Sequence, residues 1–333
     1  MSQQKSILLI YTGGTIGMIK GSSGSLKPFN FEKLTAEIPE LKKFDLSLNA
    51  IAYKNPIDSS NMHPKEWVHL AKLIKKHYAN YDGFVVLHGS DTMAYTASAL
   101  SFLLEGLCKP VILTGSQLPV GVRRTDAKEN LITAIEIAAS GYTPEVCVYI
   151  EYKLLRGNRT VKVNAEHFEA FDSPNFPPLA EAGVRIKYQN KAVCDMDKSL
   201  VAHQKMEEQV AILKLYPGIT KSVVNAFLSS GSKGIILETF GSGNATTQAW
   251  FLNALKSAIN KGVVVLNISQ CLAGSVSQGL YETSSELEEI GVVSGGDMTT
   301  EAALTKLMFL LGQELSIEKI KSQLRISLRG ELS

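Results

Sequence analysis

Short apolar segments alternate with amphipathic helical segments through the first part of this chain. The segments with the length and polarity of sheet strands are residues 6–11, 46–53, 84–88, 111–114 and 146–151. A helix beginning near Pro64 carries apolar residues on one face, namely Trp67, Leu70, Ala71 and Ile74. Residues Asp126 to Glu129 are typical of a capping box that opens a helix toward Ser140. This alternation predicts an α/β fold with a doubly wound, mainly parallel sheet.

The pattern lapses in the mostly polar stretch 189–208 and then resumes. Strands are predicted at 209–215, 234–239 and 263–269, and helices at 221–228, 248–259, 300–311 and 317–324. A chain of 333 residues with 45% hydrophobic residues can bury two cores. We predict a larger α/β domain at 1–188 that carries the catalytic residues, a linker at 189–208, and a smaller α/β domain at 209–333.

Two glycine-flanked hydroxyl turns follow two of the predicted strands. Thr12-Gly13-Gly14-Thr15 follows residues 6–11, and Gly89-Ser90-Asp91-Thr92 follows residues 84–88. Open α/β sheets bind ligands at this carboxyl edge, and a hydroxyl group needs a base or a favourable field to act as a nucleophile. Each turn also has a plainer interpretation. The first could be only a tight turn, and Asp91 could cap a helix that begins near Thr92.

Lys162 and a polar loop complete the candidate groups. Lys162 follows the predicted strand at 146–151, and a desolvated lysine can serve as a base for a neighbouring hydroxyl, although most loop lysines are solvated. Asp58-Ser59-Ser60 follows the strand at 46–53 and suits the charged ends of a zwitterion. Together these groups predict hydroxyl-nucleophile chemistry on a small substrate.

Composition excludes several classes of protein. The formal net charge is only +2, without a basic block, so neither nucleic acid nor an anionic membrane surface is indicated as a partner. The six histidines form no HExxH pair, and we predict no metal. Apolar runs stay short of the roughly 20 residues that span a bilayer, and no secretory signal is recognisable. We expect a cytoplasmic protein with reduced thiols at the widely spaced Cys108, Cys147, Cys194 and Cys271.

In combination, the motifs resemble the bacterial type I, cytoplasmic L-asparaginases. The matching segments run in order along almost the whole chain, at residues 11–18, 58–62, 88–102, 110–117, 156–162, 173–178 and 328–332. The resemblance implies an amidohydrolase that converts L-asparagine to L-aspartate and ammonia through an acyl-enzyme, without a cofactor. It also implies a homodimer or homotetramer.

The resemblance assigns a role to each candidate residue. Thr15 matches the nucleophile of the first site. A second catalytic set of hydroxyl, carboxylate and amine is matched by Ser90, Asp91 and Lys162. Substrate contacts are matched by Asp58, Ser59, Ser60, Ser90, Asp91 and, from a neighbouring subunit, Asn244.

Three positions depart from the family pattern. Serine stands at position 90, where threonine is usual, so the hydroxyl is kept while its rotamer is less restricted. The usual lid tyrosine is absent, and Ser25 stands near its place. Some type I enzymes bind asparagine at a separate activating site that includes an arginine. Glu238 stands at the position of that arginine, whereas Ser269 and Cys271 match other positions of this regulatory site. The reversed charge at Glu238 predicts weak or absent activation by asparagine.

Three other functions remain open from the sequence. A glutaminase–asparaginase would use the same hydroxyl groups on a longer amide. An asparaginase-like subunit of a transamidation complex would supply ammonia for amino acids linked to tRNA. A small-molecule sensor would bind its ligand at Thr15 and Ser90 without reacting.

Overall fold

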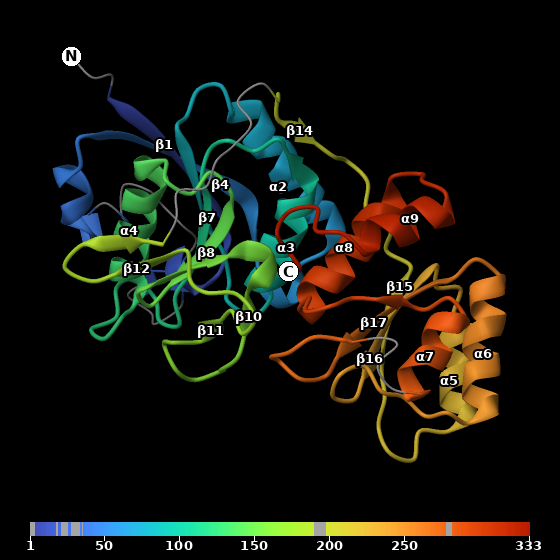
Figure 1. The fold of residues 1–333 in the computed structure, drawn as a ribbon. Coiled ribbons are helices and arrows are strands. Elements are labelled where there is room, and N and C mark those ends of the chain that lie inside the picture. The colour runs from blue at the N-terminus through green and yellow to red at the C-terminus, as the bar shows by residue number, and fades with distance from the viewer. Residues whose placement is uncertain are drawn as a thin grey trace. The chain divides into compact units, whose positions relative to one another are not determined.

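The chain divides into two compact α/β units, Met1–Gln204 and Lys205–Ser333. The computed structural model describes residues 4–17, 19–20, 26–27, 34, 36–189, 198–277 and 282–333. Ser25 and Cys194 therefore lie outside the described residues. Figure 1 shows the first unit in blue to yellow-green and the second in yellow to red. The division falls within the polar stretch 189–208, and the predicted α/β class is confirmed for both units.

The described part of the first unit is built on an eight-stranded sheet. Its order is β13 (Ile186–Tyr188), β12 (Ala180–Ala182), β9 (Lys153–Arg156), β8 (Val146–Ile150), β7 (Val111–Thr114), β5 (Gly83–Leu87), β1 (Lys5–Gly13) and β4 (Leu46–Ile57). Strands β4, β1, β5, β7 and β8 are mutually parallel, as predicted. Antiparallel pairing then adds β9, β12 and β13, which the sequence patterns did not predict.

Helices cover both faces of this sheet, because its central strands are apolar on both sides (Figure 1). Helix α4 (Ala127–Ser140) packs its buried face, including Leu131 and Ile135, against Ile7, Leu9 and Val85. Helices α2 (Pro64–His77) and α3 (Met93–Leu103) pack against each other, and α3 also contacts β7 and β8. This arrangement leaves the carboxyl edge of the parallel strands to loops.

Small pairings extend the first unit. They join β2 (Ile19–Lys20) to β3 (Leu26–Lys27), β6 (Leu104–Glu105) to β14 (Val201–Ala202), and β10 (Val161–Lys162) to β11 (Phe171–Asp172). The 3-10 helices are η1 (Thr15–Gly17), η2 (Pro39–Lys43), η3 (Ser59–Asn61) and η4 (Gly157–Arg159). Strand β14 shows that part of the stretch predicted as a linker pairs with the first unit.

The second unit has a parallel sheet of four strands within its described residues. The order is β15 (Val210–Lys214), β16 (Gly234–Thr239), β17 (Val264–Ser269) and β18 (Val293–Ser294). Its helices are α5 (Lys221–Leu228), α6 (Ala249–Asn260), α7 (Glu282–Glu289), α8 (Thr300–Gly312) and α9 (Ile317–Leu324). Helices α5 and α6 share a core with the sheet, and α8 contacts β15, β16 and β17. No helix in the described parts of either unit is long and apolar enough to cross a membrane.

A buried polar chain supports the loop that follows β5. The His88 ring is fully buried, with Nδ1 2.7 Å from the Gly89 carbonyl oxygen and Nε2 2.9 Å from Thr96 Oγ1. A carbonyl oxygen only accepts, so Nδ1 donates and Nε2 accepts from Thr96. Trp67 Nε1 donates to the same hydroxyl oxygen at 3.0 Å. Burial lowers the pKa of His88 to about 4, in keeping with this neutral ring.

The neutral His88 predicts a loss of stability in acid. The unfolded chain binds a proton near pH 6.5, whereas the folded ring resists protonation down to about pH 4. His88 therefore contributes its full stabilisation above pH 6.5 and loses it as the pH falls, about 3 kcal/mol between pH 7 and pH 4. We expect urea unfolding to show a steeper loss in the wild type than in His88→Gln, whose side chain does not titrate. Equal pH slopes would contradict this account.

Candidate active site

Three loops meet at the carboxyl edge of β1, β4 and β5. Their backbones can come this close because Gly14 and Gly89 have no side chains. A Cβ atom on Gly14, whose φ is +86°, would lie 2.4 Å from the backbone nitrogen of Gly89. A Cβ atom on Gly89 would lie 2.5 Å from Ser59 Oγ. Real Cβ atoms do not tolerate such distances, so side chains at either position would separate the loops. The hydroxyl turns predicted from the sequence are therefore spatial neighbours.

The turn that carries Thr15 is held by buried side chains of β1. Thr15 is partly buried and begins the 3-10 helix η1. The Tyr11 hydroxyl donates to the Gly14 carbonyl oxygen at 3.1 Å, and Thr12 Oγ1 donates to the Leu87 carbonyl oxygen at 3.0 Å. Burial raises the pKa of Tyr11 to about 12, so its hydroxyl keeps its proton as a donor. These bonds fix the peptide immediately before Thr15 and join its turn to β5.

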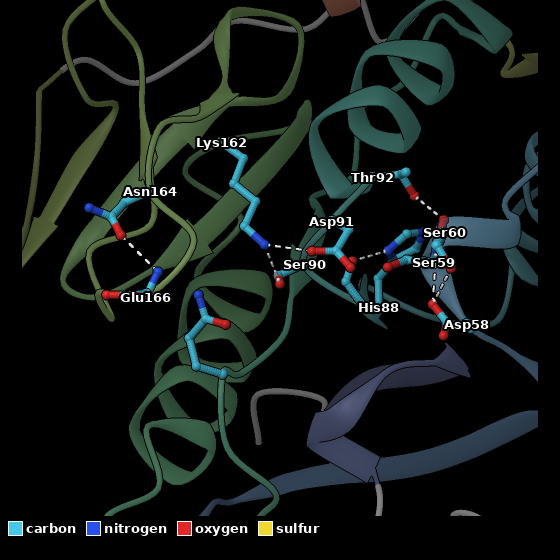
Figure 2. A network of polar contacts seen from close by, with 12 residues as sticks. Asp58, Ser59, Ser60, His88, Ser90, Asp91, Thr92, Lys162, Asn164 and Glu166 are labelled. Atoms are coloured by element: carbon cyan, nitrogen blue, oxygen red, sulfur yellow. Dashed lines mark hydrogen bonds and ion pairs between the residues drawn. The ribbon is translucent and has the colours of Figure 1, made fainter.

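Ser90, Asp91 and Lys162 form one hydrogen-bonded group (Figure 2). Lys162 Nζ lies 2.9 Å from Ser90 Oγ and 2.7 Å from Asp91 Oδ1. The Lys162 side chain is only 18% exposed, whereas that of Asp91 is 65% exposed. Thr92 occupies the N-cap position of α3, and Asp91 pairs with Lys162. The structure thus favours the charge-holding interpretation of Asp91 over the capping one.

Lys162 reaches Ser90 from a small hairpin, more than seventy positions later in the chain. Strand β10 places Lys162 opposite Phe171 of β11 in an antiparallel pair. The preceding 3-10 helix η4 packs against α3, and Thr160 Oγ1 donates to the Arg156 carbonyl oxygen at 2.7 Å. Lys162 therefore belongs to a separate two-stranded sheet, and its amine is directed toward the loop after β5 (Figure 2).

The loop after β4 presents a charged and polar surface. Asp58 Oδ1 accepts from the Ser60 backbone N–H at 3.0 Å and from the Ser60 hydroxyl at 2.8 Å (Figure 2). The backbone N–H and then the hydroxyl of Ser60 lower the pKa of Asp58, which favours an exposed carboxylate anion. Ser59 is 4% exposed, and Thr92 Oγ1 donates to its carbonyl oxygen at 2.7 Å. Asp58, Ser59 and Ser60 are thus joined to the loop that carries Ser90.

The remaining predicted residues belong to the second unit. Asn244 lies in a turn whose backbone bridges to Phe240. Glu238 is the next-to-last residue of β16 and is 8% exposed. Its carboxylate accepts from Thr300 Oγ1 at 2.8 Å and lies 3.5 Å from Lys214 Nζ. Ser269 Oγ donates to the Gly241 carbonyl oxygen and accepts from the backbone N–H of Cys271, a free and exposed cysteine. Glu238 and Ser269 therefore lie near the carboxyl ends of the neighbouring strands β16 and β17, and Cys271 follows β17.

Sequence patterns missed the supports of this site. Tyr11 and His88 read as ordinary strand residues, although they hold the turns before Thr15 and Ser90. The available signal was their place directly before a glycine turn. Asp126 was predicted to cap α4, but its side chain makes no capping bond. Among the described residues, no group of three His, Cys, Asp or Glu side chains is arranged to hold a metal ion.

Comparison with known proteins identifies the family. The family model for the asparaginase N-terminal domain matches residues 6–194, and the glutaminase/asparaginase C-terminal domain matches residues 209–324. L-asparaginase 1 of Escherichia coli K12 is 45% identical over 99% of both chains. The crystal structure of L-asparaginase I from Vibrio cholerae has a TM-score of 0.92 at 43% identity, over 99% of both chains.

A more distant structure, named as a probable cytoplasmic L-asparaginase from Campylobacter jejuni, has a TM-score of 0.79 at 27% identity. It aligns with 96% of this chain and 99% of its own. The agreement spans both units and includes all the segments that carry the candidate residues. The chain therefore belongs to the asparaginase family of amidohydrolases and, within it, to the type I L-asparaginases.

Proposed function

We propose that this protein hydrolyses the side-chain amide of L-asparagine to L-aspartate and ammonia through an acyl-enzyme on Thr15. The observation that carries the proposal is the contact of Lys162 Nζ with both Ser90 Oγ and Asp91 Oδ1. A hydroxyl bonded to an amine, which in turn is oriented by a carboxylate, is the arrangement that activates an oxygen nucleophile.

The reaction then proceeds in two balanced steps. Thr15 Oγ1 forms a bond to the amide carbon, and its proton passes through Ser90 to the amine of Lys162. The carbon–nitrogen bond breaks as the leaving nitrogen takes that proton back from Lys162 through Ser90, which releases ammonia, leaves an ester on Thr15 and restores the base. Water loses a proton to the same base, attacks the ester and releases aspartate, and Thr15 regains its proton. No cofactor takes part in either step.

Backbone groups stabilise the charge that develops during each attack. The tetrahedral intermediate carries a negative oxygen, and in this mechanism N–H groups of the two glycine turns donate to it. Support for this role comes from the close approach of Gly14 to Gly89, which puts main-chain atoms of both turns beside one another. Fixed dipoles of this kind need no reorganisation when the charge forms.

Charge complementarity accounts for binding of the zwitterionic substrate. Asp58 and Asp91 offer carboxylates to the α-ammonium group, and Ser59 and Ser60 offer hydrogen bonds to the α-carboxylate. The lowered pKa of Asp58 supports this role, since the anion is available at neutral pH. Asn244 of a neighbouring subunit completes the substrate contacts in a cytoplasmic homodimer or homotetramer.

The edge of the second sheet that carries Glu238 offers little to a second asparagine. Glu238 is a buried carboxylate that already accepts from Thr300 and lies beside Lys214. A substrate carboxylate brought to this position would meet like charge, which disfavours it. Activation by asparagine is therefore weak or absent in this enzyme.

Ammonia release tests the reaction. We expect saturable release from L-asparagine by the purified protein, and a fall in kcat of roughly a thousand-fold or more in Thr15→Ala, because that variant lacks the attacking oxygen. Thr15→Ser, which keeps a hydroxyl, should retain measurable activity. A folded wild-type protein that releases no ammonia from asparagine would contradict the proposal.

Three further measurements on the purified protein distinguish this proposal from the other functions that the sequence left open. Comparable kcat/KM for L-glutamine measured in parallel would support a glutaminase–asparaginase. Thermal stabilisation by asparagine without ammonia release would support a sensor. Transfer RNA that copurifies with the protein would support the transamidation subunit.

Substitution at Ser90 tests the second catalytic group. Ser90→Ala removes the oxygen that Lys162 contacts, and we expect it to lower kcat/KM by about a hundred-fold or more. Ser90→Thr, which keeps the hydroxyl and restricts its rotamer, should stay within about ten-fold of the wild type. Near-normal kcat/KM in Ser90→Ala would remove Ser90 from the mechanism.

The shape of the rate curve tests the regulatory proposal. Initial rates over a wide range of asparagine concentrations should follow a simple hyperbola, because Glu238 disfavours a second carboxylate. A sigmoidal curve with a Hill coefficient near two would show activation and overturn this expectation.

A further inference from the structure

Asp126 is a buried carboxylate that the proposed reaction does not use. It stands at the N-terminus of α4 and is 6% exposed, yet its side chain makes no capping bond. Its two oxygens accept from the backbone N–H of Gln117 at 3.1 and 3.0 Å, and Oδ1 also accepts from the N–H of Leu118 at 3.2 Å. The Asp126 carboxylate therefore holds the loop that follows β7 by hydrogen bonds to its backbone.

Asn130, one turn further along α4, hydrogen-bonds to the same loop and also to the residue that follows β8. Its side chain is 1% exposed, and Nδ2 donates to the Gly115 carbonyl oxygen at 3.0 Å and to Asp126 Oδ2 at 3.3 Å. Asn130 Oδ1 accepts from the backbone N–H of Glu151 at 3.1 Å. One face of α4 thus binds the ends of both β7 and β8.

The loop that follows β7 lies against the loop that carries Ser90. A Cβ atom on Gly115 would lie 2.5 Å from the His88 carbonyl oxygen, so the two backbones are in close contact. The His88 peptide is itself fixed by a bond from its N–H to the Thr114 carbonyl oxygen at 3.0 Å. A shift of the loop after β7 would therefore press on the segment just before Ser90.

Gln117 connects the same loop to the hairpin that carries Lys162. Gln117 Nε2 donates to the His167 carbonyl oxygen at 3.3 Å. Inside the hairpin, Asn164 Oδ1 accepts from the backbone N–H groups of Glu166 and His167 at 2.8 and 2.9 Å, the first of which is drawn in Figure 2. The loop of the hairpin is thus stabilised by its own hydrogen bonds. Gln117 links it to the loop after β7, whose backbone bonds to Asp126.

We propose that Asp126 is a positioning residue for Lys162, acting through the backbone and the side chain of Gln117. The carboxylate fixes the Gln117 peptide, the Gln117 amide fixes the hairpin, and the hairpin sets where the Lys162 amine meets Ser90. A displacement of about 1 Å at a reacting group can cost up to a hundred-fold in rate. The inference rests on the proposed function for its kinetic consequence, but its structural part can be tested without activity.

Three single variants test the inference. We expect Asp126→Asn to lower kcat by about ten-fold with KM within about two-fold, because substrate-binding groups outside this network are untouched. Gln117→Leu should lower kcat in the same way, by about three-fold, without loss of thermal stability. Glu129→Gln is the matched control, since it removes one charge from the exposed face of the same helical turn. Unchanged kcat in both Asp126→Asn and Gln117→Leu would overturn the inference.

The double variant decides whether the two residues act in series. If Asp126 acts through Gln117, the losses in kcat are not additive, and Asp126→Asn combined with Gln117→Leu resembles Asp126→Asn alone. Additive losses would show independent effects and overturn the proposed route.

Amide hydrogen exchange supplies the readout that does not depend on catalysis. Exchange in peptides covering residues 162–170 should rise in Asp126→Asn and Gln117→Leu and stay at the wild-type level in Glu129→Gln. Unchanged exchange in the first two variants would overturn the inference even if their activity fell. A wild-type protein without asparaginase activity would refute the proposed function, whereas raised exchange in the two variants would still support the link from Asp126 to the hairpin.

Discussion

The close approach of Gly14 to Gly89 is the constraint on which the rest of the first unit's site depends. Main-chain atoms of two strand-end turns occupy the space that a Cβ atom would need. Only with both turns this close can Thr15, the Ser59 loop and Ser90 share one edge of the sheet. Parallel strands bring their carboxyl ends to the same edge of the sheet. Because Gly14 and Gly89 have no side chains, the three loops at that edge can also come into contact.

Loops packed this tightly bury peptide groups that would otherwise bond to water, and each needs a partner. The Tyr11 hydroxyl donates to the Gly14 carbonyl oxygen, and the His88 ring donates to the Gly89 carbonyl oxygen. The Asp126 carboxylate accepts from the backbone N–H groups of Gln117 and Leu118. A buried polar group left without a partner costs roughly 1 to 3 kcal/mol, so these side chains stabilise a geometry that the glycines merely permit.

The sequence predicted the parallel strands well because fully apolar runs such as residues 84–88 have few other stable environments. It did not predict β9, β12 and β13, since their short segments carry no clear period. Local capping rules gave Asp126 the wrong partner, because a carboxylate at a helix N-terminus can also bind loop N–H groups that are distant in sequence. The contact between Lys162 and Ser90 likewise depends on tertiary packing. Only the resemblance to a family linked the two residues.

All the contacts that join Lys162, Ser90 and Asp91 lie within the first unit, whereas Glu238, Ser269 and Cys271 lie within the second. Charge at the end of β16 can therefore change without altering any of those hydrogen bonds. The Glu238 carboxylate accepts from Thr300 and pairs with Lys214, so both of these partners lie within the second unit. In the proposed mechanism, the groups that act on the substrate can therefore stay in place when the charge at position 238 changes.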